Sequence, residues 1–284
     1  ERDSLAERYK RVKNKCLQLQ TERRKGKVFG MFTGDVRSIK KTDRITRLVE
    51  HLYAKLPEIE AARAELITES YRETEGQPVV MRRAKAFAHI LENIPIIIRP
   101  EELVAGSSTI APRGCQTYPE FSYEWLEAEF DTVEHRAADP FYIAEDTKKR
   151  LKEANRYWKG KTTSELAYSY MEPETHRAME HNFFTPGNYF YNGVGHITVQ
   201  YEKVLQIGFA GIKKEAQEEL ASCCVGAENY ARKSRFLQAV ILSCDAVIGY
   251  SKRYAKLAQE MAAKEGNAQR KKELLTIAEN CAKV

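Results

Sequence analysis

All nine prolines of this 284-residue chain lie between Pro57 and Pro186, and this distribution restricts the fold more than any other feature. A proline inside a helix removes a backbone hydrogen bond and clashes with the preceding turn, so the Pro-free end of the chain can hold uninterrupted helices. Apolar residues recur there at helical spacing. The sequence therefore predicts three long helices, over residues 197–222, 227–264 and 267–283.

The part of the chain that contains the prolines predicts shorter elements. Thr162 followed by Glu165 predicts a capping box at the start of one of them, because the hydroxyl and the carboxylate each bind a free backbone amide. Pro57 is expected to end one helix and to allow the next. The predicted helices are residues 42–55, 58–75, 79–93, 119–131, 143–157, 163–171 and 173–181.

A short apolar stretch after Pro95 is the best candidate for a β-strand. Residues 96–98 are three isoleucines, and residues 103–106 are apolar and end in a glycine. Continuous apolar residues are typical of a strand that is buried on both faces, which is the prediction for residues 103–105. One or two strands among many helices indicate either a helical bundle or an incomplete α/β domain.

The positive charge is concentrated at the start of the chain. Residues 1–27 hold ten basic and four acidic side chains, which accounts for the whole net charge of +6. Apolar residues in this segment follow one stripe of a helix, and glycines then form a short linker. We therefore predict a basic amphipathic arm with its linker at residues 1–34 and a neutral body at residues 35–284. The stripe consists of Leu5, Tyr9, Val12, Cys16 and Leu19.

Two interpretations of the arm stay open: it docks on a partner, or it packs on its own body. Stacking aromatic residues do not accompany its charges, so we do not expect a nucleic-acid partner. The longest apolar run is far shorter than the ~18 residues that cross a bilayer, and no signal segment opens the chain. We therefore expect no membrane span and a cytoplasmic location.

The cysteines and histidines predict neither a disulfide framework nor a metal site. The six cysteines show no C-x-x-C spacing, so we expect reduced thiols. His176 and His181 are five residues apart, which is a poor spacing for two ligands on one helical face. Walker, dinucleotide-binding and zinc-protease motifs are absent. The cysteines are Cys16, Cys115, Cys223, Cys224, Cys244 and Cys281.

Residues 183–196, with the sequence FFTPGNYFYNGVGH, form the most unusual segment of the chain. Five aromatic residues in nine, followed by two glycines and His196, cannot form a regular helix. A loop walled by aromatic side chains excludes water. A helix is expected just after His196, and its positive N-terminal end would favour a neutral His196 imidazole, or a bound oxygen atom, beside it. A ligand site and a buried loop with a core histidine are both possible, and spacing alone favours the loop.

Three segments of the chain resemble one enzyme family. Residues 184–205 read FTPGNYFYNGVGHITVQYEKVL, residues 158–167 read WKGKTTSELA, and residues 65–106 begin ELITESYRETEGQP and end EELVAG. These segments are similar to the N-terminal part of the cobalamin-independent glycerol and propane-1,2-diol dehydratases, which are glycyl radical enzymes of the pyruvate formate-lyase family. The resemblance runs from about residue 40 to the end of the chain.

The resemblance implies a fold, a reaction and one site residue. The fold is α/β, and this chain is the mainly helical N-terminal portion, a fragment, of a ten-stranded glycyl radical enzyme barrel. The reaction is that of an anaerobic lyase that converts a small 1,2-diol such as propane-1,2-diol or glycerol into an aldehyde and water. His196 matches the family histidine that holds the substrate's hydroxyl, and choline-cleaving relatives carry an aspartate there.

The remaining catalytic groups of the family are expected outside this chain. The thiyl cysteine of the family is followed by x-Glu, and none of the six cysteines here is. Residues 247–250, VIGY, are the nearest match to the family's radical-glycine loop, but they lie in a helical stripe and are predicted to be helix. We therefore expect no catalytic residue and no bound cofactor in this chain, which alone is expected to be inactive.

The resemblance also implies partners for the enzyme and leaves two alternative functions open. An S-adenosylmethionine-dependent activating enzyme would install the glycyl radical, and a second copy of the chain would complete a homodimer. Residues 1–25 are of the kind that directs enzymes to a bacterial microcompartment shell. The first residue, Glu1, favours a fragment of a longer enzyme. The alternatives are a glycyl radical lyase for another small substrate, such as choline, and a truncated noncatalytic scaffold or binding protein.

Overall fold

The structure, a computed structural model, describes residues 42–186, 191, 195 and 197–284. By its internal contacts the chain divides into two units, residues 1–50 and 51–284. The predicted arm and linker lie outside the described residues and stay a prediction. Helix α2 (Asp43–Tyr53) confirms the helix predicted at residues 42–55.

Helices α3 and α4 pack against each other near the start of the second unit. Helix α4 (Val79–Asn93) has the predicted bounds. Helix α3 (Ala62–Glu73) begins later than the predicted residue 58, because Glu58–Glu60 form strand β1. The prediction of a helix start directly after Pro57 was therefore wrong.

Strand β1 is held by segments that lie far along the chain. It pairs in parallel with strand β2 (Gly114–Gln116), and Ile59 lies opposite Cys115. The backbone amide of Ile59 also donates to the carbonyl oxygen of Tyr142 at 2.9 Å. These long-range hydrogen bonds override the local helical pattern of residues 58–61. Within the described part of the chain, the sheet has these two strands.

The strand predicted at residues 96–98 and 103–106 was wrong, and so was its expected burial. Glu101 has a φ of 68°, a left-handed conformation that ends any extended run. Leu103 and Val104 are 53% and 84% exposed. Ile98 is buried, but it packs against Tyr254 and other residues of two helices rather than in a sheet. The apolar stretch is therefore an irregular loop, buried at Ile98 and exposed at Leu103 and Val104.

Short helices follow this loop, in the order in which they were predicted. Their bounds are close to the predicted ones, except that α5 is much shorter than residues 119–131. The predicted helices are α5 (Glu124–Ala128), α6 (Glu145–Trp158), α7 (Thr163–Ser169) and α8 (Pro173–Glu180). The 3₁₀ turn η2 (Val133–His135), between α5 and α6, was not predicted.

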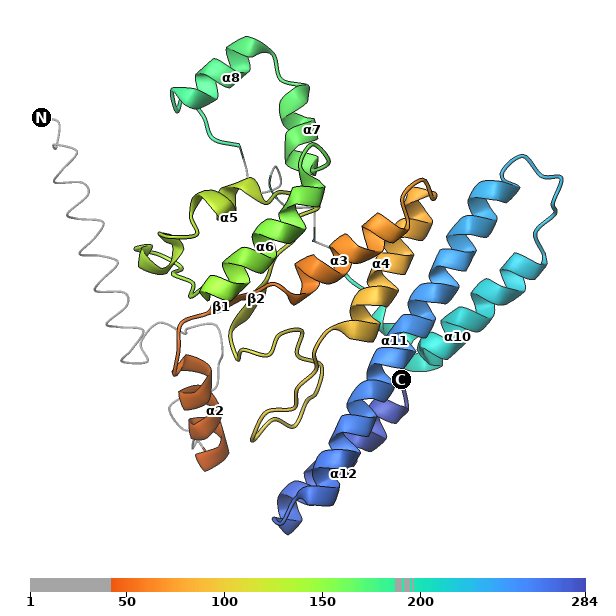
Figure 1. Ribbon diagram of the computed structural model, residues 1–284. Helices are drawn as coiled ribbons and strands as arrows, with labels where there is room; N and C mark the ends of the chain where they lie inside the picture. Colours follow the sequence, from red (N-terminus) through yellow and green to blue (C-terminus); the bar gives the residue numbers. More distant parts are fainter. Residues whose placement is uncertain (1–41, 187–190, 192–194, 196) are drawn as a thin grey trace, which may run out of the picture. The chain divides into compact units, whose positions relative to one another are not determined.

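The Pro-free end forms the predicted long helices, α10 (Tyr201–Ala221), α11 (Tyr230–Lys264) and α12 (Ala268–Ala282). Helix α11 is the longest, and α4, α10 and α12 contact it along its length (Figure 1). Gly249 lies inside α11, which confirms that residues 247–250 are helical. Helix α10 is kinked at Gly208, whose φ of 62° glycine can adopt because it has no Cβ atom.

The second unit has separate hydrophobic clusters. One lies around strand β1 and helices α5 and α6, a second joins α11 to α12, and a third joins α3, α4 and α6. The first contains Ile59, Ala61, Ala64, Leu126, Phe130, Val133, Ile143 and Leu151; the second Ile98, Tyr254, Ala258, Ala262, Leu274, Ile277 and Ala278; the third Ile67, Ala86 and Trp158.

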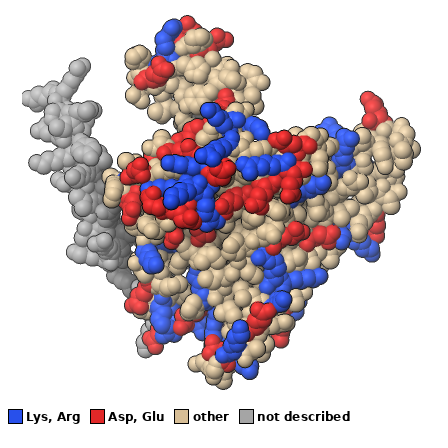
Figure 2. Space-filling model, viewed as in Figure 1, with Lys and Arg blue, Asp and Glu red and all other residues tan. Residues whose placement is uncertain are grey.

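The charged side chains on the face drawn in Figure 2 alternate in sign rather than forming a patch of one sign. On α6, Lys148 contacts Asp131 at 3.0 Å and Arg150 pairs with Glu65. The charges on this face are therefore mixed and locally paired. Among the described helices, none combines the length and hydrophobicity that crossing a bilayer requires. The described cysteines, which exclude Cys16, are all unbridged.

The capping box predicted at Thr162 and Glu165 is present, and it gives a first test of the fold. Thr162 Oγ1 accepts from the Glu165 amide at 3.1 Å, and the Glu165 carboxylate accepts from the Thr162 amide at 3.1 Å. We expect Thr162→Ala to lower the free energy of unfolding by about 1–2 kcal/mol. Thr163→Ala, at the exposed next position, is the matched control. Equal urea midpoints for the two variants would contradict a stabilising role of the box.

Candidate functional site

The aromatic segment at residues 183–196 is attached to α7 through the phenol of Tyr191. Tyr191 Oη lies 3.2 Å from Tyr168 Oη. Burial, followed by this hydrogen bond, raises the pKa of Tyr168 to about 12. The Tyr168 phenol therefore stays protonated at neutral pH and can donate to or accept from Tyr191.

His176 on α8 in turn fixes Tyr168. The two rings stack, with centroids 5.8 Å apart and an interplanar angle of 20°. His176 Nε2 lies 3.1 Å from the backbone oxygen of Tyr168, and because a carbonyl oxygen only accepts, that nitrogen carries a hydrogen. Helices α7 and α8 thus support the aromatic segment at Tyr191.

His196, the predicted substrate-binding residue, lies outside the described residues. The helix predicted to begin just after it begins at Tyr201, with Gln200 as its N-cap. That part of the prediction was wrong, since residues 197–200 are not helical. The role predicted for His196 stays a prediction.

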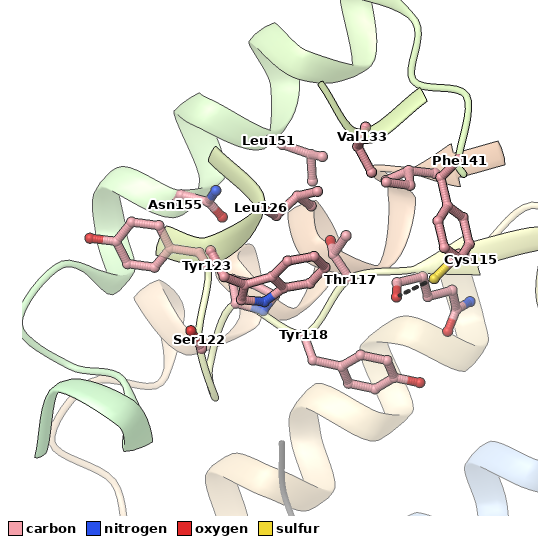
Figure 3. Close-up of a pocket in the computed structure, with 14 residues that line it drawn as sticks. Cys115, Thr117, Tyr118, Ser122, Tyr123, Leu126, Val133, Phe141, Leu151 and Asn155 are labelled. Carbon is pink, nitrogen blue, oxygen red and sulfur yellow. Dashed lines mark hydrogen bonds between the residues drawn. The ribbon is translucent and has the colours of Figure 1, made fainter. Parts of the chain in front are cut away.

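The first hydrophobic cluster encloses a cavity of about 230 Å³ (Figure 3). Strands β1 and β2, helices α5 and α6 and the connection between β2 and α5 contribute to its walls. Aliphatic and aromatic side chains dominate the lining. The lining residues are Ile59, Cys115, Gln116, Thr117, Tyr118, Pro119, Ser122, Tyr123, Trp125, Leu126, Val133, Phe141, Leu151 and Asn155.

Arg63 on α3 fixes the connection that forms one wall of this cavity. Its guanidinium donates to the Thr117 carbonyl oxygen at 3.0 Å and forms a bidentate pair with Glu120. The same group lies 3.8 Å from the centre of the Tyr118 ring. Three contacts from one rigid guanidinium hold residues 117–120 in a defined conformation.

Two titratable groups that line the cavity, Cys115 and Tyr123, are neutral at physiological pH. Burial raises the pKa of the Cys115 thiol. Burial, with the nearby charges of Glu165, Glu124 and Glu127, raises the pKa of Tyr123 to about 12. The amide of Asn155 donates to Glu127 at 2.8 Å. Among the described residues, no three His, Cys, Asp or Glu side chains are grouped to hold a metal ion.

This cavity could not be predicted from the sequence, because its lining comes from segments between Ile59 and Asn155 that only the tertiary fold brings together. The aromatic segment, in contrast, was visible in the sequence. Its attachment through Tyr168 and His176 was not, since both residues lie on helices of ordinary composition.

Comparison with known proteins decides the family. A model of proteins described as pyruvate formate lyase-like matches residues 39–284. The chain belongs to this family. The match confirms the resemblance to the pyruvate formate-lyase family of glycyl radical enzymes, together with the mainly helical, partial fold expected from it.

Solved structures of this family superpose well on the chain. A structure described as 1,2-propanediol dehydration in Roseburia inulinivorans is 71% identical, has a TM-score of 0.82, and is matched over 86% of this chain and 29% of that one. The glycerol-bound B12-independent glycerol dehydratase of Clostridium butyricum is 50% identical, has a TM-score of 0.81, and is matched over 86% and 31%.

Curated relatives in the pyruvate formate lyase-like family also include enzymes with other substrates. The isethionate sulfite-lyase of Oleidesulfovibrio alaskensis is 35% identical over 252 residues, which are 86% of this chain and 30% of that protein. The chain therefore spans less than a third of the length of this relative.

Proposed function

We propose that the protein carrying this chain is a glycyl radical lyase that dehydrates a small 1,2-diol, such as propane-1,2-diol or glycerol, to an aldehyde. The identity of 71% to the Roseburia inulinivorans structure, which is described as 1,2-propanediol dehydration, carries this proposal. The identity to the isethionate sulfite-lyase is half as large, at 35%. The identity of 50% to a glycerol dehydratase supports the same substrate class.

This chain contributes substrate binding rather than radical chemistry. The glycyl radical, installed by an S-adenosylmethionine-dependent activating enzyme on a glycine outside this chain, would supply hydrogen-atom abstraction through a cysteine. Gly249 does not fit that role, because it lies within α11 and not in a loop. His196 is assigned to hold one hydroxyl of the diol.

The support around Tyr191 would place the segment that carries His196. Tyr191 is five residues from His196, and its phenol reaches Tyr168, which stacks on His176. Exact placement of hydrogen-bonding groups determines how well an enzyme binds the reacting state. We therefore assign Tyr168 and His176 to the support of the binding segment.

The proposed partners are an activating enzyme and a second copy of the chain. The basic amphipathic arm, at residues 1–25, is proposed to dock on a bacterial microcompartment shell. The nine basic side chains of residues 1–25 and their apolar stripe suit an amphipathic partner surface. The cytoplasm, or a microcompartment within it, would be the location of the enzyme.

A substrate panel tests the proposed function. The protein that carries this chain is activated anaerobically with its activating enzyme and offered propane-1,2-diol, glycerol, choline and isethionate in parallel. We expect an aldehyde from a diol at a kcat/KM at least about 100-fold above that for choline or isethionate, because an unmatched polar group in a buried site is strongly disfavoured. Sulfite release from isethionate as the fastest reaction would replace the diol proposal with a carbon–sulfur lyase. A protein that acquires no glycyl radical and turns over none of the four substrates would favour the noncatalytic scaffold.

A further inference from the structure

Helix α7, which carries Tyr168, is bonded at its first residues to the connection between β2 and α5. The backbone amide of Thr163 donates to the carbonyl oxygen of Glu120 at 3.3 Å. The next amide, that of Ser164, donates to the carbonyl oxygen of Phe121 at 3.0 Å, and Ser164 itself is buried. The position of α7 therefore depends on where residues 120 and 121 lie.

Arg63 fixes Glu120 from the opposite side. The pair is bidentate, and its side chains are only 12% and 15% exposed. Two parallel hydrogen bonds from a guanidinium fix the orientation of a carboxylate as well as its distance. Glu120 thus binds Arg63 with its carboxylate and α7 with its backbone oxygen, and so joins the two elements.

Helix α3, which carries Arg63, is a rigid base for this link. It packs against α4 and α6. Ala64, the next residue, is fully buried. One turn further along α3, Thr68 Oγ1 accepts from the indole nitrogen of Trp158 at 2.8 Å. Elements with dense packing and buried hydrogen bonds open least often in a native protein, so the Cα atom of Arg63 has a defined position.

Helix α7 carries the link on to the aromatic segment. Tyr168 lies five positions after Thr163, which is about 7.5 Å along the helix axis. A displacement of the first turn of α7 therefore moves the Tyr168 phenol, which lies 3.2 Å from the phenol of Tyr191. Hydrogen-bond networks and rigid helices in series can couple distant positions in this way.

We propose that Arg63 is a positioning residue for the substrate-binding segment. Through Glu120 it holds the start of α7, and α7 in turn holds the phenol of Tyr168 against Tyr191. Arg63 acts through these residues and not by contact with the diol. This inference rests on the proposed function, because it takes Tyr168 as part of the support of the segment that carries His196.

Hydrogen–deuterium exchange in the protein that carries this chain tests the link without reference to turnover. In Arg63→Met, peptides covering residues 162–170 and 183–196 should exchange at least about tenfold faster, because the amides of Thr163 and Ser164 lose fixed acceptors. Arg150→Met is the matched control, since Arg150 also pairs with a glutamate of α3 but is 45% exposed. It should leave both peptides within twofold.

A double-mutant cycle tests the link to the substrate. In the radical-loaded protein, Arg63→Met and Tyr168→Phe should each lower kcat/KM for propane-1,2-diol about tenfold, with a rise in KM. If Arg63 acts through Tyr168, the double variant should lose little more than Arg63→Met alone, whereas independent effects would multiply to about 100-fold. A partly unfolded sample would instead lower kcat at an unchanged KM.

Arg63→Lys keeps the positive charge but not the two parallel hydrogen bonds, and it is expected to fold. It should give a smaller rise in exchange and in KM than Arg63→Met, and it replaces that variant in the cycle if Arg63→Met does not fold.

Three results would overturn the proposal. Unchanged exchange at residues 162–170 in the Arg63 variants would show that Arg63 does not hold α7. Multiplied losses in the double variant, or a loss confined to kcat, would leave Arg63 with a structural role only. The exchange result is independent of the substrate, so it separates this proposal from diol dehydration. If the substrate panel identifies another substrate, the cycle is measured with that substrate.

Discussion

Arg99→Met is expected to lower the free energy of unfolding by about 3 kcal/mol or more, because it removes a buried charge from a dense hydrogen-bond network. The Arg99 side chain is 6% exposed and pairs with Glu102 at 2.9 Å. Its guanidinium also reaches Ser107 Oγ at 3.1 Å and three backbone oxygens. These are the carbonyl oxygens of Thr109, Ile110 and Ala111, at 2.7, 3.1 and 2.9 Å.

The network joins the loop after Arg99 to the long C-terminal helices. Tyr254 on α11 donates to the Ser107 carbonyl oxygen at 2.8 Å. Arg270 on α12 donates to the Glu102 carbonyl oxygen at 2.7 Å. Loss of the Arg99 guanidinium would remove one donor from the Glu102 carboxylate and from each of these loop carbonyls, and the docking of this loop on α11 and α12 would weaken with it.

Arg156→Met is the matched control, because Arg156 also forms an ion pair three residues away along the chain. Its side chain is 75% exposed and that of its partner Glu153 is 62% exposed. Exposed pairs of this kind contribute little, so we expect a change within about 0.5 kcal/mol. Urea unfolding of the two variants is the measurement. Similar midpoints would show that the buried network around Arg99 does not stabilise the fold.

The long helices could be predicted because their local pattern and their packing agree. In α11 the residues that recur at helical spacing include Leu237, Cys244, Tyr254 and Ala258, and these four are buried. Local propensity and tertiary packing then favour the same structure, which is the condition under which sequence patterns are informative.

The strands could not be predicted, because tertiary contacts alone make them extended. Glu58–Glu60 is short and two-thirds acidic. The carboxylate of Glu60 accepts from the backbone amide of Ala111 at 2.7 Å, a partner far away in the sequence. The isoleucines at residues 96–98 carry the stronger local signal for a strand but find no pairing partner among the described residues.

The candidate site was partly predictable for a similar reason. The irregular aromatic segment follows from composition, and its resemblance to one family assigns His196. The support by Tyr168 and His176 is a contact between two helices and a loop. The conformation of residues 117–120 depends on Arg63, which lies on another element. Neither arrangement produces a periodic pattern of residues in the sequence.

His196→Ala is expected to lower kcat/KM for propane-1,2-diol by about 100-fold or more, if His196 binds the hydroxyl of the substrate as proposed. Removal of one preorganised hydrogen-bonding group from an active site has an effect of about 100- to 1,000-fold. His196→Asn, which keeps one hydrogen-bonding group of similar reach, should lose less. Anaerobic turnover by the radical-loaded protein, with aldehyde as the measured product, gives these values.

His181→Ala is the matched control, because His181 is an exposed histidine at the end of α8. We expect its kcat/KM to stay within about twofold of the unsubstituted protein, in line with the small effects of surface substitutions. The yield of glycyl radical, measured by electron paramagnetic resonance, should be the same in all variants, so a loss of turnover reports on substrate binding and not on activation. An unchanged kcat/KM in His196→Ala, at full radical yield, would remove His196 from the site and return it to the interpretation as a structural histidine of the aromatic loop.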